Sequence, residues 1–221
     1  MPGCRRPERR RAARRFGLAY AAAVICGLCS CWPASPSGAQ SADPDWPCQQ
    51  APMKTISAAT IWTGPSLDGL ANSWRDDPII STLAPRIAAR RTSMADADAA
   101  IDDYAHQLGA NRQAKLTLLF AAALEIIDDE RAALIRGIHR YTKRQQALAD
   151  QIRKRAADLD QLGEGTSQDV AAKREMLLEA QNWDTRIFDD RRRVLPYVCE
   201  QPQVLEQRIY ALAKKIEGDL K

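Results

Sequence analysis

Apolar residues recur at spacings of three, four and seven positions from residue 127 to residue 162. These are the spacings of the a and d positions of a coiled coil, which only a helix brings to one face. Polar side chains occupy the remaining a and d positions of the pattern. The pattern therefore predicts a long helix that packs against another helix. The apolar positions are Ile127, Leu134, Ile138, Tyr141, Leu148, Ile152, Leu159 and Leu162, and the polar ones are Arg131, Gln145 and Arg155.

A second pattern of this kind follows a break at Gly163-Glu164-Gly165. A short Gly-rich turn between two such segments is typical of an antiparallel helical hairpin, which we place at residues 128–195. At 1.5 Å per residue, arms of about 30 residues measure roughly 45–50 Å. Pro196 and Pro202 are expected to interrupt the helix before a last amphipathic helix. The returning arm is expected to pack through Lys173, Met176, Ala180, Trp183, Ile187, Asp190 and Val194.

The remaining segments predict an all-α fold. Residues 115–127 are apolar on most sides, which is typical of a helix buried in a core, and no stretch alternates convincingly with period two. We therefore expect a helical bundle over residues 93–221, with a long antiparallel coiled-coil-like hairpin and one disulfide. Residues 40–92, which several prolines punctuate, are expected to form an irregular N-terminal segment with short helices.

The first 39 residues have the order of a secretory signal peptide. Seven arginines among the first 15 residues precede an apolar run of about 16 residues and then a stretch rich in proline and small residues. The best cleavage position follows Ser37-Gly38-Ala39. Cys31 offers an alternative, because the sequence before it resembles a lipoprotein cleavage box, and its lipidation would anchor the chain to a membrane. Arg14-Arg15 fits a twin-arginine signal less well, since Gly17 occupies a place for a large apolar residue.

Removal of this signal leaves two cysteines, Cys48 and Cys199. A single pair of cysteines in an exported protein is most simply a disulfide. It would tie the start of the mature chain to its C-terminal region.

The charge balance also depends on the signal. The whole chain has 32 Lys and Arg and 28 Asp and Glu, and residues 1–39 hold seven and one of these. The remainder has 25 basic and 27 acidic residues, a net charge of −2. The basic character belongs to the signal, so it does not indicate a nucleic-acid partner.

No pattern of catalytic, metal-binding or cofactor-binding residues is apparent. His106 and His139 each lack a second ligand at the spacing of a zinc site. Adjacent acidic residues such as Asp102-Asp103 point about 100° apart on a helix, so they do not converge as paired catalytic carboxylates must. We therefore predict no catalytic residue, no metal and no cofactor, and no enzymatic activity.

Four tryptophans are many for a mature helical domain of this size. Core packing accounts for most of them, but tryptophan is also common at binding hot spots. Trp46, which lies beside Cys48, and Trp62 are the candidate partner-binding residues.

The sequence thus favours a periplasmic or secreted, non-enzymatic helical protein that binds or scaffolds another envelope protein. One alternative is a lipoprotein with a structural or stress role, anchored to a membrane through Cys31. A second alternative is an enzyme or small-ligand binder with an unrecognised site.

Overall fold

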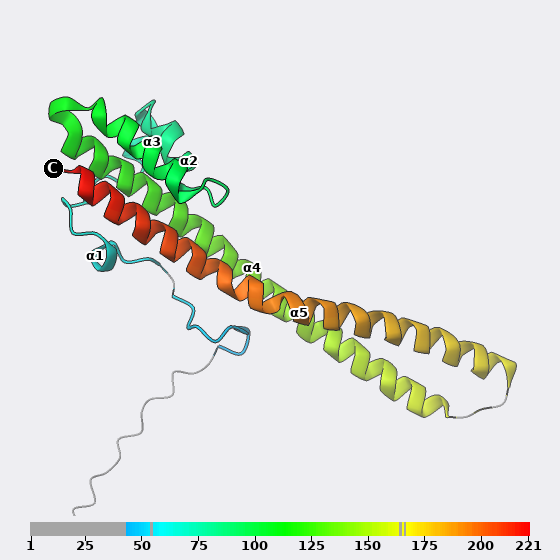
Figure 1. Ribbon diagram of the computed structural model, residues 1–221. Coiled ribbons are helices and arrows are strands. Elements are labelled where there is room, and N and C mark those ends of the chain that lie inside the picture. Colours follow the sequence, from blue (N-terminus) through cyan, green and yellow to red (C-terminus); the bar gives the residue numbers. More distant parts are fainter. Residues whose placement is uncertain (1–42, 54, 164, 166) are drawn as a thin grey trace, which may run out of the picture. The chain divides into compact units, whose positions relative to one another are not determined.

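The computed structural model describes residues 43–53, 55–163, 165 and 167–221 (Figure 1). The predicted signal peptide at residues 1–39, with Cys31, lies outside the described residues. Residues 41–221 form one compact unit, and everything below concerns that unit. In its described residues there is no strand, which confirms the all-α class. Its elements are α1 (Ala58–Ile61), the 3-10 helix η1 (Ser73–Asp76), α2 (Ile80–Ala88), α3 (Met94–His106), the 3-10 helix η2 (Gly109–Asn111), α4 (Arg112–Leu162) and α5 (Gln168–Asp219).

Two long antiparallel helices, α4 and α5, form the predicted hairpin (Figure 1). They contain 51 and 52 residues, so each is roughly 75 Å long. α4 ends before Gly163, whose φ of 56° suits a glycine. α5 starts after Ser167, whose side chain accepts a hydrogen bond from the Val170 N–H at 3.3 Å. The hairpin is confirmed, but its helices extend well beyond the predicted range of 128–195.

The predicted interruption at Pro196 and Pro202 is wrong, because α5 runs through both prolines. A proline in a helix interior costs about 3 kcal/mol or more, since it removes a hydrogen bond and clashes with the preceding turn. Dense packing on the C-terminal side offsets this cost. Leu205, Ile209 and Leu212 are fully buried, so the predicted last helix is the final part of α5.

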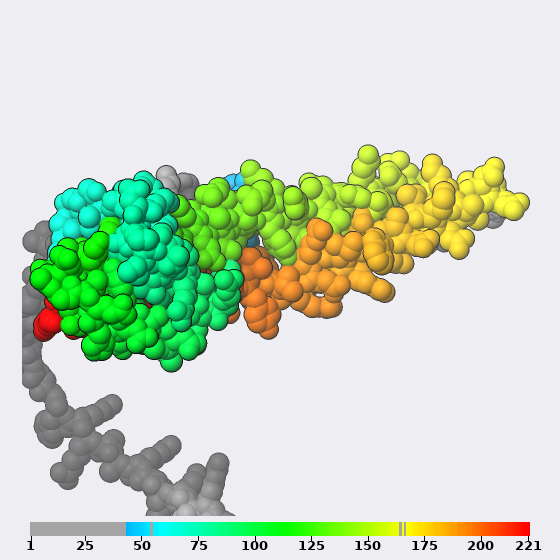
Figure 2. Space-filling model, turned by 90° about the horizontal axis from the view of Figure 1, so that it is seen from above, coloured from blue at the N-terminus to red at the C-terminus, as the bar shows by residue number. Residues whose placement is uncertain are grey.

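One end of the hairpin carries the hydrophobic core, and we call it the base. It comprises α2, α3, α4 as far as Arg131 and α5 from Pro202 onward. Figure 2 shows the side chains of the α2–α3 region, in cyan to green, covering this end. Beyond it only α4 and α5 continue, and we call residues 132–162 and 168–201 the arm. The largest fully buried side chains of the base are Phe120, Ile80, Ile87, Ile101, Leu116, Leu119, Ile127, Leu205, Ile209, Leu212 and Ile216.

Helix α2 belongs to this core, so the predicted boundary between residues 92 and 93 does not separate two structural parts. Asp77 fixes its start: one carboxylate oxygen accepts hydrogen bonds from the N–H groups of Ile79 and Ile80, at 3.0 and 2.9 Å. The other oxygen pairs with Lys115 of α4 at 2.6 Å. The Ile80 hydrogen bond, followed by Lys115, lowers the pKa of Asp77. The carboxylate thus caps α2 and attaches it to α4.

A disulfide joins Cys48 to Cys199 of α5, with the Cα atoms 5.5 Å apart, as predicted. It holds residues 43–53, which we call the strap, against the junction of base and arm. Two further contacts secure the strap: Lys143 pairs with Asp45 at 3.2 Å, and Arg131 donates a hydrogen bond to the Met53 carbonyl at 2.6 Å. No helix in the described ranges is both long and apolar enough to cross a membrane.

Candidate protein-binding surface

A row of large apolar side chains lies exposed along α5. Met176, Trp183, Val194, Tyr197 and Val204 have exposed fractions of 65, 62, 47, 68 and 42%. Successive members are 7, 11, 3 and 7 positions apart, which are heptad spacings and place them on one face of the helix. We call this face the α5 stripe. Its complete heptad positions are Lys173, Met176, Ala180, Trp183, Ile187, Asp190, Val194, Tyr197, Gln201 and Val204.

The α5 stripe includes the residues that we expected to pack against α4, and that expectation is wrong. In the arm, α5 contacts α4 through the positions that directly follow those of the α5 stripe. Asp184 is buried and forms an ion pair with Arg155 of α4. The Phe188 carbonyl accepts a hydrogen bond from the Gln145 side chain at 3.2 Å. Two heptad patterns therefore run along α5, and the one with the larger apolar side chains is not the seam.

Polar complementarity explains this register. Arg155 occupies an a/d place of α4, so it needs a carboxylate opposite it once the helices pair. Asp184 supplies that carboxylate, whereas Trp183 or Ala180 at the same place would leave the guanidinium unpaired. The sequence could have indicated this pairing, because a charged residue at an a/d place of one helix needs an oppositely charged residue on the other helix.

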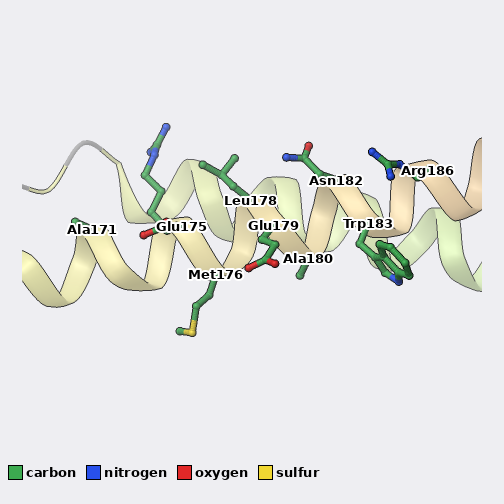
Figure 3. A pocket seen from close by; sticks show the side chains of 10 residues that line it. Ala171, Glu175, Met176, Leu178, Glu179, Ala180, Asn182, Trp183 and Arg186 are labelled. Carbon is green, nitrogen blue, oxygen red and sulfur yellow. The ribbon is translucent and has the colours of Figure 1, made fainter.

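Three residues of the α5 stripe, Met176, Ala180 and Trp183, border an open hollow and not an enclosed cavity. All the residues that line it come from α5 alone. In Figure 3, Met176, Ala180 and Trp183 point along one edge of the helix, while Leu178 and Asn182 point along the other. A small-molecule site usually encloses most of its ligand between several elements. This surface instead suits a long, continuous partner that lies against the helix.

Trp46, one of the predicted partner-binding residues, packs within the strap and onto α4. Its ring is tilted against that of His139, with the ring centroids 5.4 Å apart, and its indole N–H donates to the Gln50 carbonyl. The side chain is half-buried. A hollow of about 140 Å³ under the strap also contacts Arg131, whose partner is Glu206 at 2.6 Å. Binding of a partner at Trp46 stays a prediction.

Trp62, the other predicted partner-binding residue, lies in the core of the base. Only 8% of it is exposed, and its ring stacks on Phe120 with centroids 4.1 Å apart. Its indole N–H donates to the Pro65 carbonyl at 2.8 Å. The indole thus offers little free surface, and binding of a partner at Trp62 stays a prediction.

The two histidines make local contacts. Nδ1 of His106 lies 2.7 Å from the Asp102 carbonyl one helical turn earlier, and Nδ1 of His139 lies 3.8 Å from Asp43 of the strap. Within residues 43–221, apart from the three positions not described, no three His, Cys, Asp or Glu side chains cluster as metal ligands would.

Comparison of the chain with protein-family models, with curated proteins and with solved structures finds no match. A function is therefore inferred from the α5 stripe and from the elements that present it.

Proposed function

We propose that this is an exported, non-enzymatic protein of the cell envelope that binds a helical segment of another envelope protein along the α5 stripe. The observation that carries this proposal is the row of exposed apolar side chains at heptad spacing. Heptad spacing is complementary to a second helix, whose own a and d side chains pack between those of the stripe. The stripe extends over residues 173–204, or roughly 46 Å of helix.

The construction of the arm supports the same function. Two paired helices bury only the faces that meet, so the outer face of each stays in water. Most seam residues of the arm, including Leu148 and Ile152, are only half-buried. A third helix on the α5 stripe would cover Met176, Trp183 and Tyr197, the most exposed large apolar side chains of the arm. Burial of apolar surface of this kind is the main driving force of protein association.

The disulfide is placed so that the strap leaves the stripe open. Cys199 follows Tyr197 by two positions, which turns its side chain by about 200° around the helix axis. The strap therefore joins α5 on the side away from the stripe. Its attachment at Cys199 also secures the α4–α5 pairing at the beginning of the arm.

Export to the periplasm or beyond forms part of the proposal. It is supported by the signal-like composition of residues 1–39 and by the Cys48–Cys199 disulfide, a bond typical of oxidising compartments.

Site-specific photocrosslinking in intact cells tests this function. A photoreactive amino acid at Trp183 lies on the stripe, whereas one at Arg192 lies on the same helix but off the stripe. We expect the first probe to form a reproducible adduct with one envelope protein, and the second to give none. The purified pair should then bind in solution, and Trp183→Glu should abolish that binding while Arg192→Glu preserves it. Adducts that are equal at both positions would contradict the proposal.

A further inference from the structure

Four charged residues accompany the α5 stripe at intervals of seven positions. They are Glu179, Arg186, Arg193 and Glu200, and each directly precedes a stripe position. In a coiled coil this is the g position, where charged side chains select the partner and its orientation. Their order along the helix is acidic, basic, basic, acidic.

These charges are available to a partner. All four residues are exposed. In the part of the chain that the structure describes, Arg193 alone among them has an ion pair, with Asp190 at 2.9 Å. The side chains of that pair are 76 and 61% exposed, so the pair is weak and leaves further guanidinium N–H groups free.

The middle of the arm is basic on α4 as well. The Tyr141 hydroxyl donates a hydrogen bond to the Arg191 carbonyl, which places this part of α4 beside the basic part of α5. Arg140 and Arg144 flank Tyr141, both are exposed, and neither has an ion pair among the described residues. Positive charge at mid-arm thus comes from both helices.

The charge order disfavours a second copy of this chain as the occupant. The order reads the same in both directions, so an antiparallel copy centred on the stripe sets Arg186 opposite Arg193 and Glu179 opposite Glu200. In a parallel copy in register, a g residue faces the e position five residues later on the other helix, which sets Arg186 near Arg191 of the second copy. Like charges meet in both arrangements, and such contacts oppose association.

We infer that the occupant of the α5 stripe is an amphipathic helix of a different protein, with acidic residues opposite Arg186 and Arg193 and basic residues opposite Glu179 and Glu200. This inference rests on the proposed function, because it specifies the partner of the same surface. The symmetry of the charge order allows such a helix to bind in either direction.

Two synthetic helical peptides of about 30 residues, long enough to follow the stripe, test the inference. Both carry the same apolar a and d residues. The first has flanking charges in the order basic, acidic, acidic, basic, and the second has the reverse order. Isothermal titration calorimetry against the disulfide-bonded protein should give at least about tenfold tighter binding of the first peptide at low salt. The difference should shrink at high salt, where exposed charges are screened.

Charge-reversal variants localise the effect. Arg186→Glu with Arg193→Glu should abolish the preference between the two peptides, because each peptide then meets two opposite and two like charges along the stripe. The control, Lys154→Glu with Arg192→Glu, changes the net charge equally at exposed arm positions off the stripe, and it should keep the original preference.

The outcomes separate the inference from the proposed function. Equal binding of the two peptides, with binding lost in Trp183→Glu, would overturn the charge assignment and leave the docking site standing. Binding of neither peptide would count against the docking site itself. A concentration-dependent dimer in analytical ultracentrifugation that Trp183→Glu abolishes would overturn the inference in favour of a second copy.

Discussion

The base and the arm are built from the same two helices, yet they differ in how much apolar surface they bury. In the base, α2 and α3 cover α4 and α5, and side chains such as Phe120, Ile127 and Ile209 are fully buried. In the described residues of the arm, Ile138 and Leu159 are the only buried apolar side chains. The difference comes from the number of helices, because a pair can bury one face of each member, while a bundle surrounds them.

This difference suggests that the base stabilises the fold and that the arm presents a binding surface. The base supplies most of the folding energy, since apolar burial is the dominant favourable contribution. The arm extends the two helices into solvent and exposes the α5 stripe. A partner on that stripe would give the arm the third helix that it lacks. Matched substitutions in the base and in the arm should therefore differ in their effect on stability.

Truncation of a core side chain in the base should have the largest effect on stability. Phe120→Ala removes a fully buried ring that stacks on Trp62, and we expect a loss of about 3–5 kcal/mol in the free energy of unfolding. The matched change in the arm is Phe188→Ala, where the ring is half-buried, and it should cost about 1–2 kcal/mol. Urea denaturation measures both. Equal losses would show that base and arm are packed alike.

Removal of the disulfide should have the next largest effect on stability. Cys48→Ser with Cys199→Ser opens a link across a sequence separation of 151 residues. Disulfides typically contribute about 2–4 kcal/mol, mainly by restricting the unfolded chain. Urea denaturation of the double variant against the oxidised protein gives the difference. A loss below about 0.5 kcal/mol would mean that the other strap contacts suffice.

The arm seam should tolerate an apolar replacement of its ion pair. Asp184→Leu alone leaves the Arg155 guanidinium without its partner, and because both side chains are partly exposed we expect a cost of about 1–2 kcal/mol. Arg155→Leu together with Asp184→Leu should recover most of that loss, since apolar residues pack well at a/d places. A double-mutant cycle measured by thermal unfolding checks this. Additive losses would indicate that the two residues do not interact.

The cap of α2 should contribute a smaller, pH-dependent amount. Asp77→Ala removes the hydrogen bonds to the Ile79 and Ile80 N–H groups, at a cost of about 1 kcal/mol. The folded state lowers the pKa of Asp77 below 3.8, so this stability is fully present above pH 3.8. It is lost as the pH falls through the lowered pKa. Unfolding at pH 7 and at pH 3 should therefore show a smaller difference between variant and wild type at pH 3.

Changes on the α5 stripe should have the smallest effect on stability. Trp183→Ala alters a side chain that is 62% exposed, and we expect the free energy of unfolding to change by less than about 0.5 kcal/mol. Thermal unfolding measures this, with Phe188→Ala as the comparison on the same helix. A loss of 2 kcal/mol or more would place Trp183 in a packed interface of the chain itself.

The sequence predicted the helical class, the hairpin turn and the disulfide, because these depend on local patterns or on elimination. Heptad spacing identified α4, and Cys48 had only Cys199 as a partner once the predicted signal peptide was set aside. It failed at Pro196 and Pro202, where tertiary packing outweighs local propensity. It also failed on the register of α5, because periodicity alone cannot rank two heptad patterns that share one helix.

The candidate surface was not recognised from the sequence. We expected partner binding at Trp62 and packing against α4 at Trp183, but Trp62 lies in the core and Trp183 is exposed. Whether Trp183 is buried depends on which face of α5 meets α4, and the Arg155–Asp184 pair across the hairpin determines that face. The charged seam residue Arg155 on α4 indicates this pairing, and the local pattern of α5 does not.

We expect a partner to cover the α5 stripe in the cell, and protection of an introduced thiol measures this coverage. Val194→Cys introduces a thiol of similar size on the stripe, and Arg192→Cys introduces one two positions away on the outer side of α5. In the purified protein both should react rapidly with a membrane-permeant maleimide. In intact cells we expect Val194→Cys to be protected and Arg192→Cys to react. Equal reactivity of the two thiols in cells would contradict it.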